Sequence, residues 1–143
     1  MTSLRVKPRK GDFSQARVSV RGVLADAGWA DVDPQRSGVD LGIVTAAGRP
    51  ACCTVEQQFW MEPRRTQFDF WDKRRSICPP LNDMRITVRR RGRAAFEFRA
   101  LSVDLTAGMP PDLTLEVIIG DHCSIGALPF TALRRQGGAL VYP

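Results

Sequence analysis

Alternation of apolar and polar residues with a period of two constrains this chain more than any other feature. It occurs in segments 17–21, 84–89, 94–99 and 113–117. Successive side chains of such a segment point to opposite faces of a β-strand, so that one face enters a core and the other meets water. The residues on the apolar side, which we expect to be buried, are Val18, Val20, Met84, Ile86, Val88, Phe96, Phe98, Leu113, Leu115, Val117 and Ile119.

Further short strands, separated by turn residues, are predicted along the whole chain. They cover residues 4–6, 15–24, 39–45, 52–61, 66–72, 84–89, 94–105, 113–119, 123–130 and 141–142. About eight to ten short strands with turns every 8–12 residues indicate a β-sandwich or barrel. The 143 residues suit one all-β domain, residues 1–143. Apolar residues change from even to odd positions after Phe98, which predicts a β-bulge near Ala100–Leu101.

The charge is basic, with 21 Lys and Arg residues against 15 Asp and Glu residues. Such a surface favours polyanions, but these charges are spread along strands, so a solvated surface is the simpler interpretation and nucleic acid is not expected as a partner. No apolar run approaches the roughly 18 residues that span a bilayer, so we expect no membrane span. Met1–Gly11 lacks the apolar stretch of a signal peptide.

Four cysteines occur, at positions 52, 53, 78 and 123. There is no CxxC pair and one histidine, so a structural zinc site is not expected. Cys53 and Cys123 hold the apolar parity of their strands, which predicts that both face the core. In an oxidising compartment we expect Cys53 or Cys78 to pair with Cys123; the alternative is four reduced thiols packed as small apolar groups.

A family resemblance rests on the order of several short features. These are VRG at 20–22, FDFWDK at 68–73, the basic hairpin at 84–99, VDL at 103–105, LTL at 113–115 and GDHCS at 120–124. In this order they resemble immunoglobulin-like β-sandwich repeat units that occur in tandem in large secreted bacterial proteins. The resemblance implies an immunoglobulin-like antiparallel β-sandwich, an extracellular or cell-surface location and no catalytic residues. It implies neighbouring repeat domains or other protein subunits as partners.

Two features are candidates for binding a ligand. An arginine cluster around Gly92 could hold phosphate or sulfate, although such a cluster is more often a solvated hairpin tip. Its members are Arg89, Arg90, Arg91 and Arg93, of which Arg89, Arg91 and Arg93 are the candidate ligand-binding residues. Trp71 is predicted to lie opposite the apolar face of its strand, where an indole can stack on a sugar ring. Trp60, in contrast, is expected in the core.

The remaining polar clusters give weaker indications. Asp31, Asp33 and Asp40 could supply oxygen ligands to Ca²⁺, but their spacing is not that of an EF-hand, and turn capping explains them as well. His122 stands beside Asp121 without a nucleophile motif, so an enzyme is not predicted. No cofactor is expected.

The sequence thus predicts a non-enzymatic extracellular structural or adhesive module, such as a subunit of a surface assembly or filament. The terminal strands Leu4–Val6 and Val141–Tyr142 would pair with a neighbouring subunit by edge addition. The alternative is a module that binds a glycan or another polyanion, with the arginine cluster and Trp71 on one face.

Overall fold

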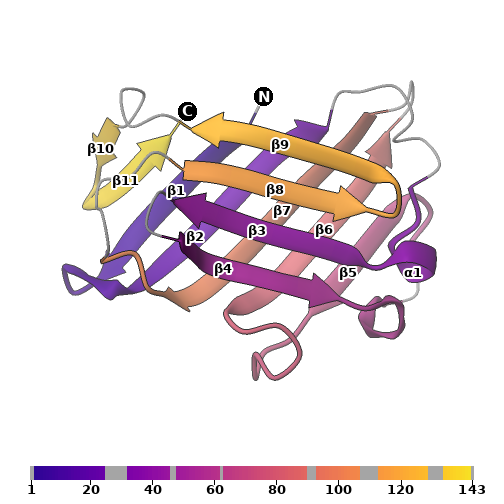
Figure 1. The fold of residues 1–143 in the computed structure, drawn as a ribbon, viewed down its shortest axis with the longest axis horizontal. Helices are drawn as coiled ribbons and strands as arrows, with labels where there is room; N and C mark the ends of the chain where they lie inside the picture. The colour runs from indigo at the N-terminus through magenta and orange to yellow at the C-terminus, as the bar shows by residue number, and fades with distance from the viewer. Residues whose placement is uncertain are drawn as a thin grey trace.

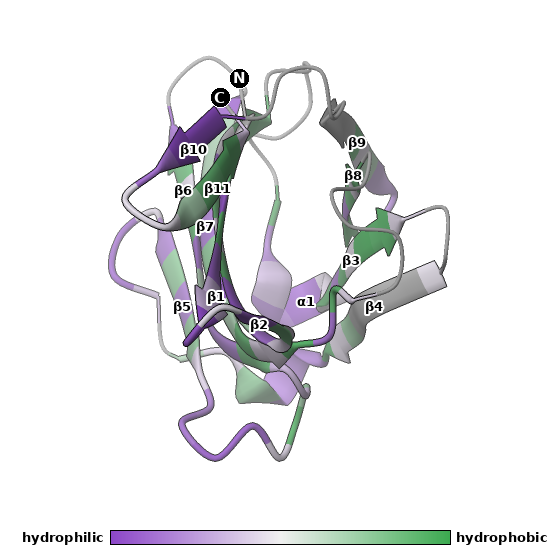
Figure 2. Ribbon diagram, turned by 90° about the vertical axis from the view of Figure 1, so that its left-hand side faces the viewer, coloured by the Kyte–Doolittle hydropathy of each residue, from purple (hydrophilic) through white to green (hydrophobic). Residues whose placement is uncertain are grey.

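A computed structural model describes residues 2–24, 32–45, 48–61, 63–89, 93–106, 113–128 and 134–142. It consists of two antiparallel β-sheets that pack against each other, as Figure 1 shows face-on and Figure 2 shows edge-on. The all-β sandwich predicted from the period-two pattern is confirmed.

The larger sheet has seven strands in the order β10-β11-β1-β2-β7-β6-β5. Its strands are β1 (Thr2–Arg9), β2 (Asp12–Leu24), β5 (Gln67–Trp71), β6 (Leu81–Arg89), β7 (Arg93–Val103), β10 (Arg134–Gln136) and β11 (Ala139–Tyr142). The smaller sheet has the order β4-β3-β8-β9. It contains β3 (Val39–Thr45), β4 (Gly48–Val55), β8 (Leu113–Ile119) and β9 (His122–Leu128). The described helices are the short α1 (Pro34–Ser37) and the 3₁₀ helix η2 (Gln57–Phe59).

The strand connections follow the immunoglobulin arrangement. With β1, β2, β3, β6, β7, β8 and β9 taken as A to G, the sheets read ABED and CFG, the order of an immunoglobulin constant domain. Strand β4 lies beside β3, where variable domains place an extra strand. Strands β5, β10 and β11 extend the larger sheet beyond that plan.

The core lies between the sheets and is formed by the residues that the alternation predicted. All of them are buried except Val88, which is half-buried. Trp60 is also buried, 6.0 Å from Phe70 between ring centroids, as predicted.

The predicted β-bulge is confirmed at the end of β7. Ala100 pairs with Val18 and Val103 pairs with Ala16, so three steps along β7 correspond to two along β2. The bulge lets Phe98 and Val103 both face the core despite their opposite parity.

The prediction of one continuous strand over residues 52–61 is wrong for the second half of that segment. Strand β4 ends at Val55, and Gln57–Phe59 form the 3₁₀ helix, with Phe59 N–H donating to the Glu56 carbonyl at 3.1 Å. The chain crosses here from the smaller sheet to the larger one, and a straight strand cannot make that crossing.

The terminal strands form as predicted, but edge addition through them is wrong. Leu4 pairs with Tyr142 and Val6 with Leu140, so the two ends of the chain pair with each other. Strand β1 lies between β2 and β11, and β11 lies between β1 and β10. Neither strand therefore offers a free edge to a neighbouring subunit.

The cysteine pairing also differs from the prediction. Cys53 forms a disulfide with Cys78, with their Cα atoms 5.5 Å apart, whereas Cys123 is free and exposed. The two-residue turn Gly120–Asp121 makes His122 the partner of the inward-facing Ile119. Cys123 therefore falls on the outer face of β9.

Candidate ligand-binding face

The outer face of the larger sheet carries two rows of polar side chains that run across its strands. Residues paired in register lie on the same face, about 4.5–5.5 Å apart. The first row is Asp69, Arg85, Glu97, Arg21 and Ser3. The second row, one pleat along, is Trp71, Asp83, Arg99, Ser19 and Arg5.

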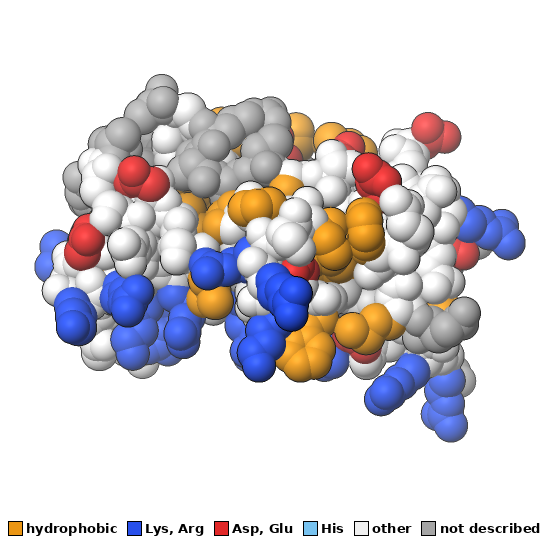
Figure 3. Space-filling view, turned by 90° about the horizontal axis from the view of Figure 1, so that it is seen from below, with side chains coloured by type: hydrophobic (Ala, Val, Ile, Leu, Met, Phe, Trp, Pro, Cys, Tyr) orange, Lys and Arg blue, Asp and Glu red, His pale blue; other side chains and the backbone are white. Residues whose placement is uncertain are grey.

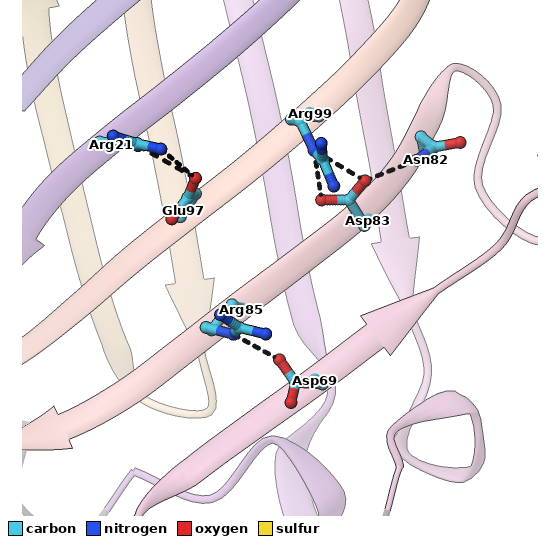
Figure 4. Close-up of polar contacts among 7 residues, drawn as sticks. All are labelled: Arg21, Asp69, Asn82, Asp83, Arg85, Glu97 and Arg99. Atoms are coloured by element: carbon cyan, nitrogen blue, oxygen red, sulfur yellow. Dashed lines mark hydrogen bonds and ion pairs between the residues drawn. The ribbon is translucent and has the colours of Figure 1, made fainter.

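Ion pairs link neighbours within both rows, as Figure 4 shows. Arg21 donates to Glu97 at 2.8 and 3.0 Å, and Arg85 Nε donates to Asp69 at 2.7 Å. In the second row, Arg99 Nε donates to both oxygens of Asp83, at 2.9 and 3.0 Å. Opposite charges on paired strands explain this order, because each cation lies directly across from a carboxylate.

Hydrogen bonding favours the ionised forms of Asp69, Arg85 and Arg99. Partial burial by itself would raise the pKa of Asp69, but hydrogen bonds from Arg85 and Gln67 outweigh it and lower that pKa. The same bond to Asp69 raises the pKa of Arg85, and the bond to Asp83 raises the pKa of Arg99. The face therefore presents fixed charges of both signs at neutral pH.

Beside these rows lies a depression of about 840 Å³, which we name the Trp71 trough. Its apolar wall is formed by Met61, Pro63 and Trp71, and its polar floor by Asp69, Asp83, Arg85 and Arg99. Trp71 is 60% exposed, whereas Phe68 and Phe70, the other aromatic residues of β5, are buried. The volume falls within the usual range for small-molecule sites.

The chain before β5 builds the apolar wall. Met61 N–H donates to the Asp69 carbonyl at 2.9 Å, and Arg64 and Gln67 exchange two backbone hydrogen bonds in a tight turn. These contacts hold Met61 and residues 63–67 along the open edge of β5. Met61, which is 45% exposed, is thereby held at the trough beside Trp71.

The arginine residues of the trough retain donors for a ligand. In the described part of the chain, Arg85 and Arg99 bond their carboxylates through Nε, one of five N–H donors that each guanidinium carries. Their side chains are 55% and 58% exposed. The trough thus combines an apolar indole surface with oriented, charged hydrogen-bond donors.

The sequence-predicted site residues do not all meet here. Arg89 and Arg93 pair with each other at the turn end of the β6–β7 hairpin. Arg89 lies six positions along β6 from Asp83, the register partner of Trp71, which corresponds to about 20 Å along the strand. Arg91 lies outside the described residues. Trp71 therefore meets Arg85 and Arg99 rather than the arginine cluster.

The candidate calcium ligands have other roles or lie apart. Asp33 caps α1 by accepting a hydrogen bond from Gln35 N–H at 2.9 Å, and it forms an ion pair with Arg36. Asp33 therefore has the capping role that was the alternative to calcium binding. Asp40 is exposed on β3, and Asp31 lies outside the described residues. Among the residues that the structure describes, no group of three His, Cys, Asp or Glu side chains could hold a metal ion.

Comparison with known proteins gives no relative: no family model, no curated protein and no solved structure matches this chain. The resemblance to secreted repeat units therefore stays a prediction. None of the helices within the described ranges has the length and apolar character needed to cross a bilayer.

Proposed function

We propose that this chain is a non-catalytic extracellular adhesive module that binds a saccharide in the Trp71 trough. The observation that carries the proposal is the 60% exposed indole of Trp71 beside two oriented arginine residues. Sugar C–H groups pack on the electron-rich face of an indole, while sugar hydroxyls need hydrogen-bond donors and acceptors around the ring. The trough offers both.

The charge of the trough favours a neutral or acidic saccharide. Four cations and three carboxylates line it in the described part of the chain. Arg85 and Arg99 can donate in pairs to a carboxylate or to vicinal hydroxyls, a geometry that a guanidinium provides and an ammonium does not. An extracellular location is supported by the Cys53–Cys78 disulfide, since such bonds persist mainly in oxidising compartments.

A glycan array with the intact protein tests the proposal. We expect specific hits that Trp71→Ala reduces at least tenfold, because this variant removes only the exposed ring. The matched control is Ile125→Ala, which removes a 65% exposed side chain from the outer face of β9 on the other sheet. An array without hits, or hits that Trp71→Ala leaves unchanged, would reject the saccharide site.

A structural role in a surface assembly is the second candidate. The observation in its favour is β9, a seven-residue strand with no described neighbour on one side and with Ile125 exposed. Such an edge can pair with a strand from another subunit. Light scattering at high protein concentration tests this role, and a strict monomer would count against it.

A further inference from the structure

A second depression of about 540 Å³, which we name the basic groove, lies between the β1–β2 hairpin and the bulged end of β7. The cations lining it are Lys7, Arg9, Lys10, Arg17 and Arg75, and no carboxylate is among its described lining residues. Figure 3 shows Lys and Arg side chains gathered at the left-hand end of the molecule, where Figure 1 places this hairpin. The groove thus differs from the trough, in which the charges are paired.

The cations of the groove repel one another across the strands. Lys7 is the register partner of Arg17, and two like charges placed directly opposite destabilise a sheet. The neighbouring Asp12 is the register partner of Arg9 but is not among the described lining residues, and its carboxylate accepts the Ser14 N–H at 2.8 Å, while the Arg9 side chain donates to the uncharged Gln15. A bound anion would relieve this repulsion.

Arg75 is fixed over the groove by the β7 bulge. Its Nη1 donates to Ser102 Oγ at 3.1 Å and lies 3.4 Å from the Leu101 carbonyl oxygen. Arg75, Ser102 and Lys10 have φ of 55°, 59° and 51°, a left-handed conformation that is rare outside glycine. Three of the four described non-glycine residues with positive φ therefore line one depression. Such clusters of unusual backbone are found at binding sites.

The loop that carries Arg75 is itself held rigidly. Asp72 is 6% exposed, and its carboxylate accepts Ile77 N–H at 2.7 Å and Arg74 N–H at 3.1 Å. Its carbonyl accepts Arg75 N–H at 3.0 Å, and the disulfide at Cys78 ties the end of the loop to β4. Arg75 is thus presented by a preorganised loop, as a binding residue requires.

We propose that the basic groove binds the sulfate or phosphate groups of an anionic polysaccharide. Arginine predominates in the groove, and its planar donors match tetrahedral oxyanions. No aromatic side chain is among the described lining residues, so the groove lacks the stacking surface that single-stranded nucleic acids use.

The position of the groove supports a saccharide as carrier of the anions. Arg17 is two residues from Ser19 on β2, and Ser19 belongs to the same cross-strand row as Trp71 and Arg99. One extended chain lying across the sheet could therefore reach both sites, because β2 lies three strand spacings from β5, or about 14 Å at about 4.8 Å per spacing. The choice of a polysaccharide rests on the proposed function, whereas the anion chemistry of the groove does not.

Calorimetric titration of the intact protein with a sulfated heparin oligosaccharide tests the groove. The double variant Lys7→Gln/Arg17→Gln is expected to bind at least tenfold more weakly and to lower the slope of log affinity against log salt by about two. The control Arg36→Gln/Arg134→Gln removes the same charge from exposed residues outside both depressions and should bind as the wild type does. Cooperative thermal unfolding shows that both variants remain folded, and the groove variant should unfold at the wild-type temperature or above it, because it removes a like-charge pair.

The outcomes separate this proposal from the proposed function. Equal heparin affinity in the groove variant and its control overturns the groove, whatever neutral glycans do. Heparin binding that depends on Lys7 and Arg17, together with array glycan binding that Trp71→Ala leaves unchanged, keeps the groove and overturns the trough. Tighter binding of duplex DNA than of heparin at the same ionic strength overturns the polysaccharide and assigns the groove to nucleic acid.

Discussion

Arg99 and Asp83 form a two-point contact, in which Arg99 Nε lies 2.9 and 3.0 Å from the two carboxylate oxygens of Asp83. Asp83 is also the register partner of Trp71. Exposed ion pairs of this kind stabilise a protein by only about 0.2–1 kcal/mol. The contact therefore matters more for holding Arg99 in place beside the indole than for stability.

The variant Asp83→Ala tests this division of roles. We expect it to lower the free energy of unfolding by less than about 1 kcal/mol, because Arg99 is 58% exposed and Asp83 is only partly buried. Saccharide affinity should fall severalfold, since Arg99 is released from its fixed position. Urea denaturation and titration with an array-identified glycan measure the two effects. A large loss of stability with unchanged affinity would show that Asp83 is structural.

Leu115→Ala tests the packing between the two sheets. Leu115 is 2% exposed at the centre of β8. Removing the isopropyl group beyond its Cβ atom leaves a cavity, which should cost about 2–5 kcal/mol in chemical denaturation. Thr114→Ala on the same strand is the control and should cost much less, since Thr114 is only half-buried. A loss below half a kcal/mol for Leu115→Ala would contradict the assignment of faces.

The Cys53–Cys78 disulfide can be tested in a way that distinguishes Cys53 from the adjacent Cys52. Mass mapping of the non-reduced protein should link position 53 to position 78, and the link should survive Cys52→Ser but not Cys53→Ser. Because the bond closes a loop with a sequence separation of 25, its loss should cost about 3–4 kcal/mol. Cys123→Ser should leave stability unchanged. A bridge to Cys123 would contradict the structure.

Acid should weaken the loop that holds Arg75. The hydrogen bond from Ile77 N–H is the largest contribution that lowers the pKa of Asp72 below its ordinary value of 3.8. A carboxyl with a lowered folded-state pKa stabilises fully above its unfolded pKa, and this stabilisation is lost as the pH falls through the folded-state pKa. Asp72→Asn should therefore be less stable than wild type at pH 7, and the difference should shrink below pH 4. Urea denaturation at both pH values checks this, and a constant difference would refute it.

The strands and their faces were predictable because the core pattern is local. In β8, Leu113, Leu115 and Val117 alternate with Thr114 and Glu116, and the pleat alone decides which side is buried. The bulge at Ala100–Leu101 followed from the same parity. The prediction that Cys123 faces the core was wrong because it used only the pattern of its own strand. The two-residue turn at Gly120–Asp121 pairs Ile119 with His122, so Cys123 points to the face opposite to that of Ile119.

The binding face was less predictable because it depends on pairing between distant strands. Arg21 and Glu97 are 76 residues apart, and nothing in the alternation of either strand reveals which residues meet. The exposed position of Trp71 followed from its parity against Phe68 and Phe70. Its neighbours Arg85 and Arg99 could be recognised as outward-facing, but not as members of one row.

Nuclear magnetic resonance of ¹⁵N-labelled protein, titrated with the strongest array glycan, tests the saccharide site most directly. The indole N–H signal of Trp71 and the Nε–H signals of Arg85 and Arg99 should shift together in a saturable way. The indole N–H of Trp60, which is buried and 3.4 Å from the Val55 carbonyl oxygen, should stay in place. Shifts confined to the outer face of the smaller sheet, with the Trp71 indole unmoved, would contradict a saccharide site in the Trp71 trough.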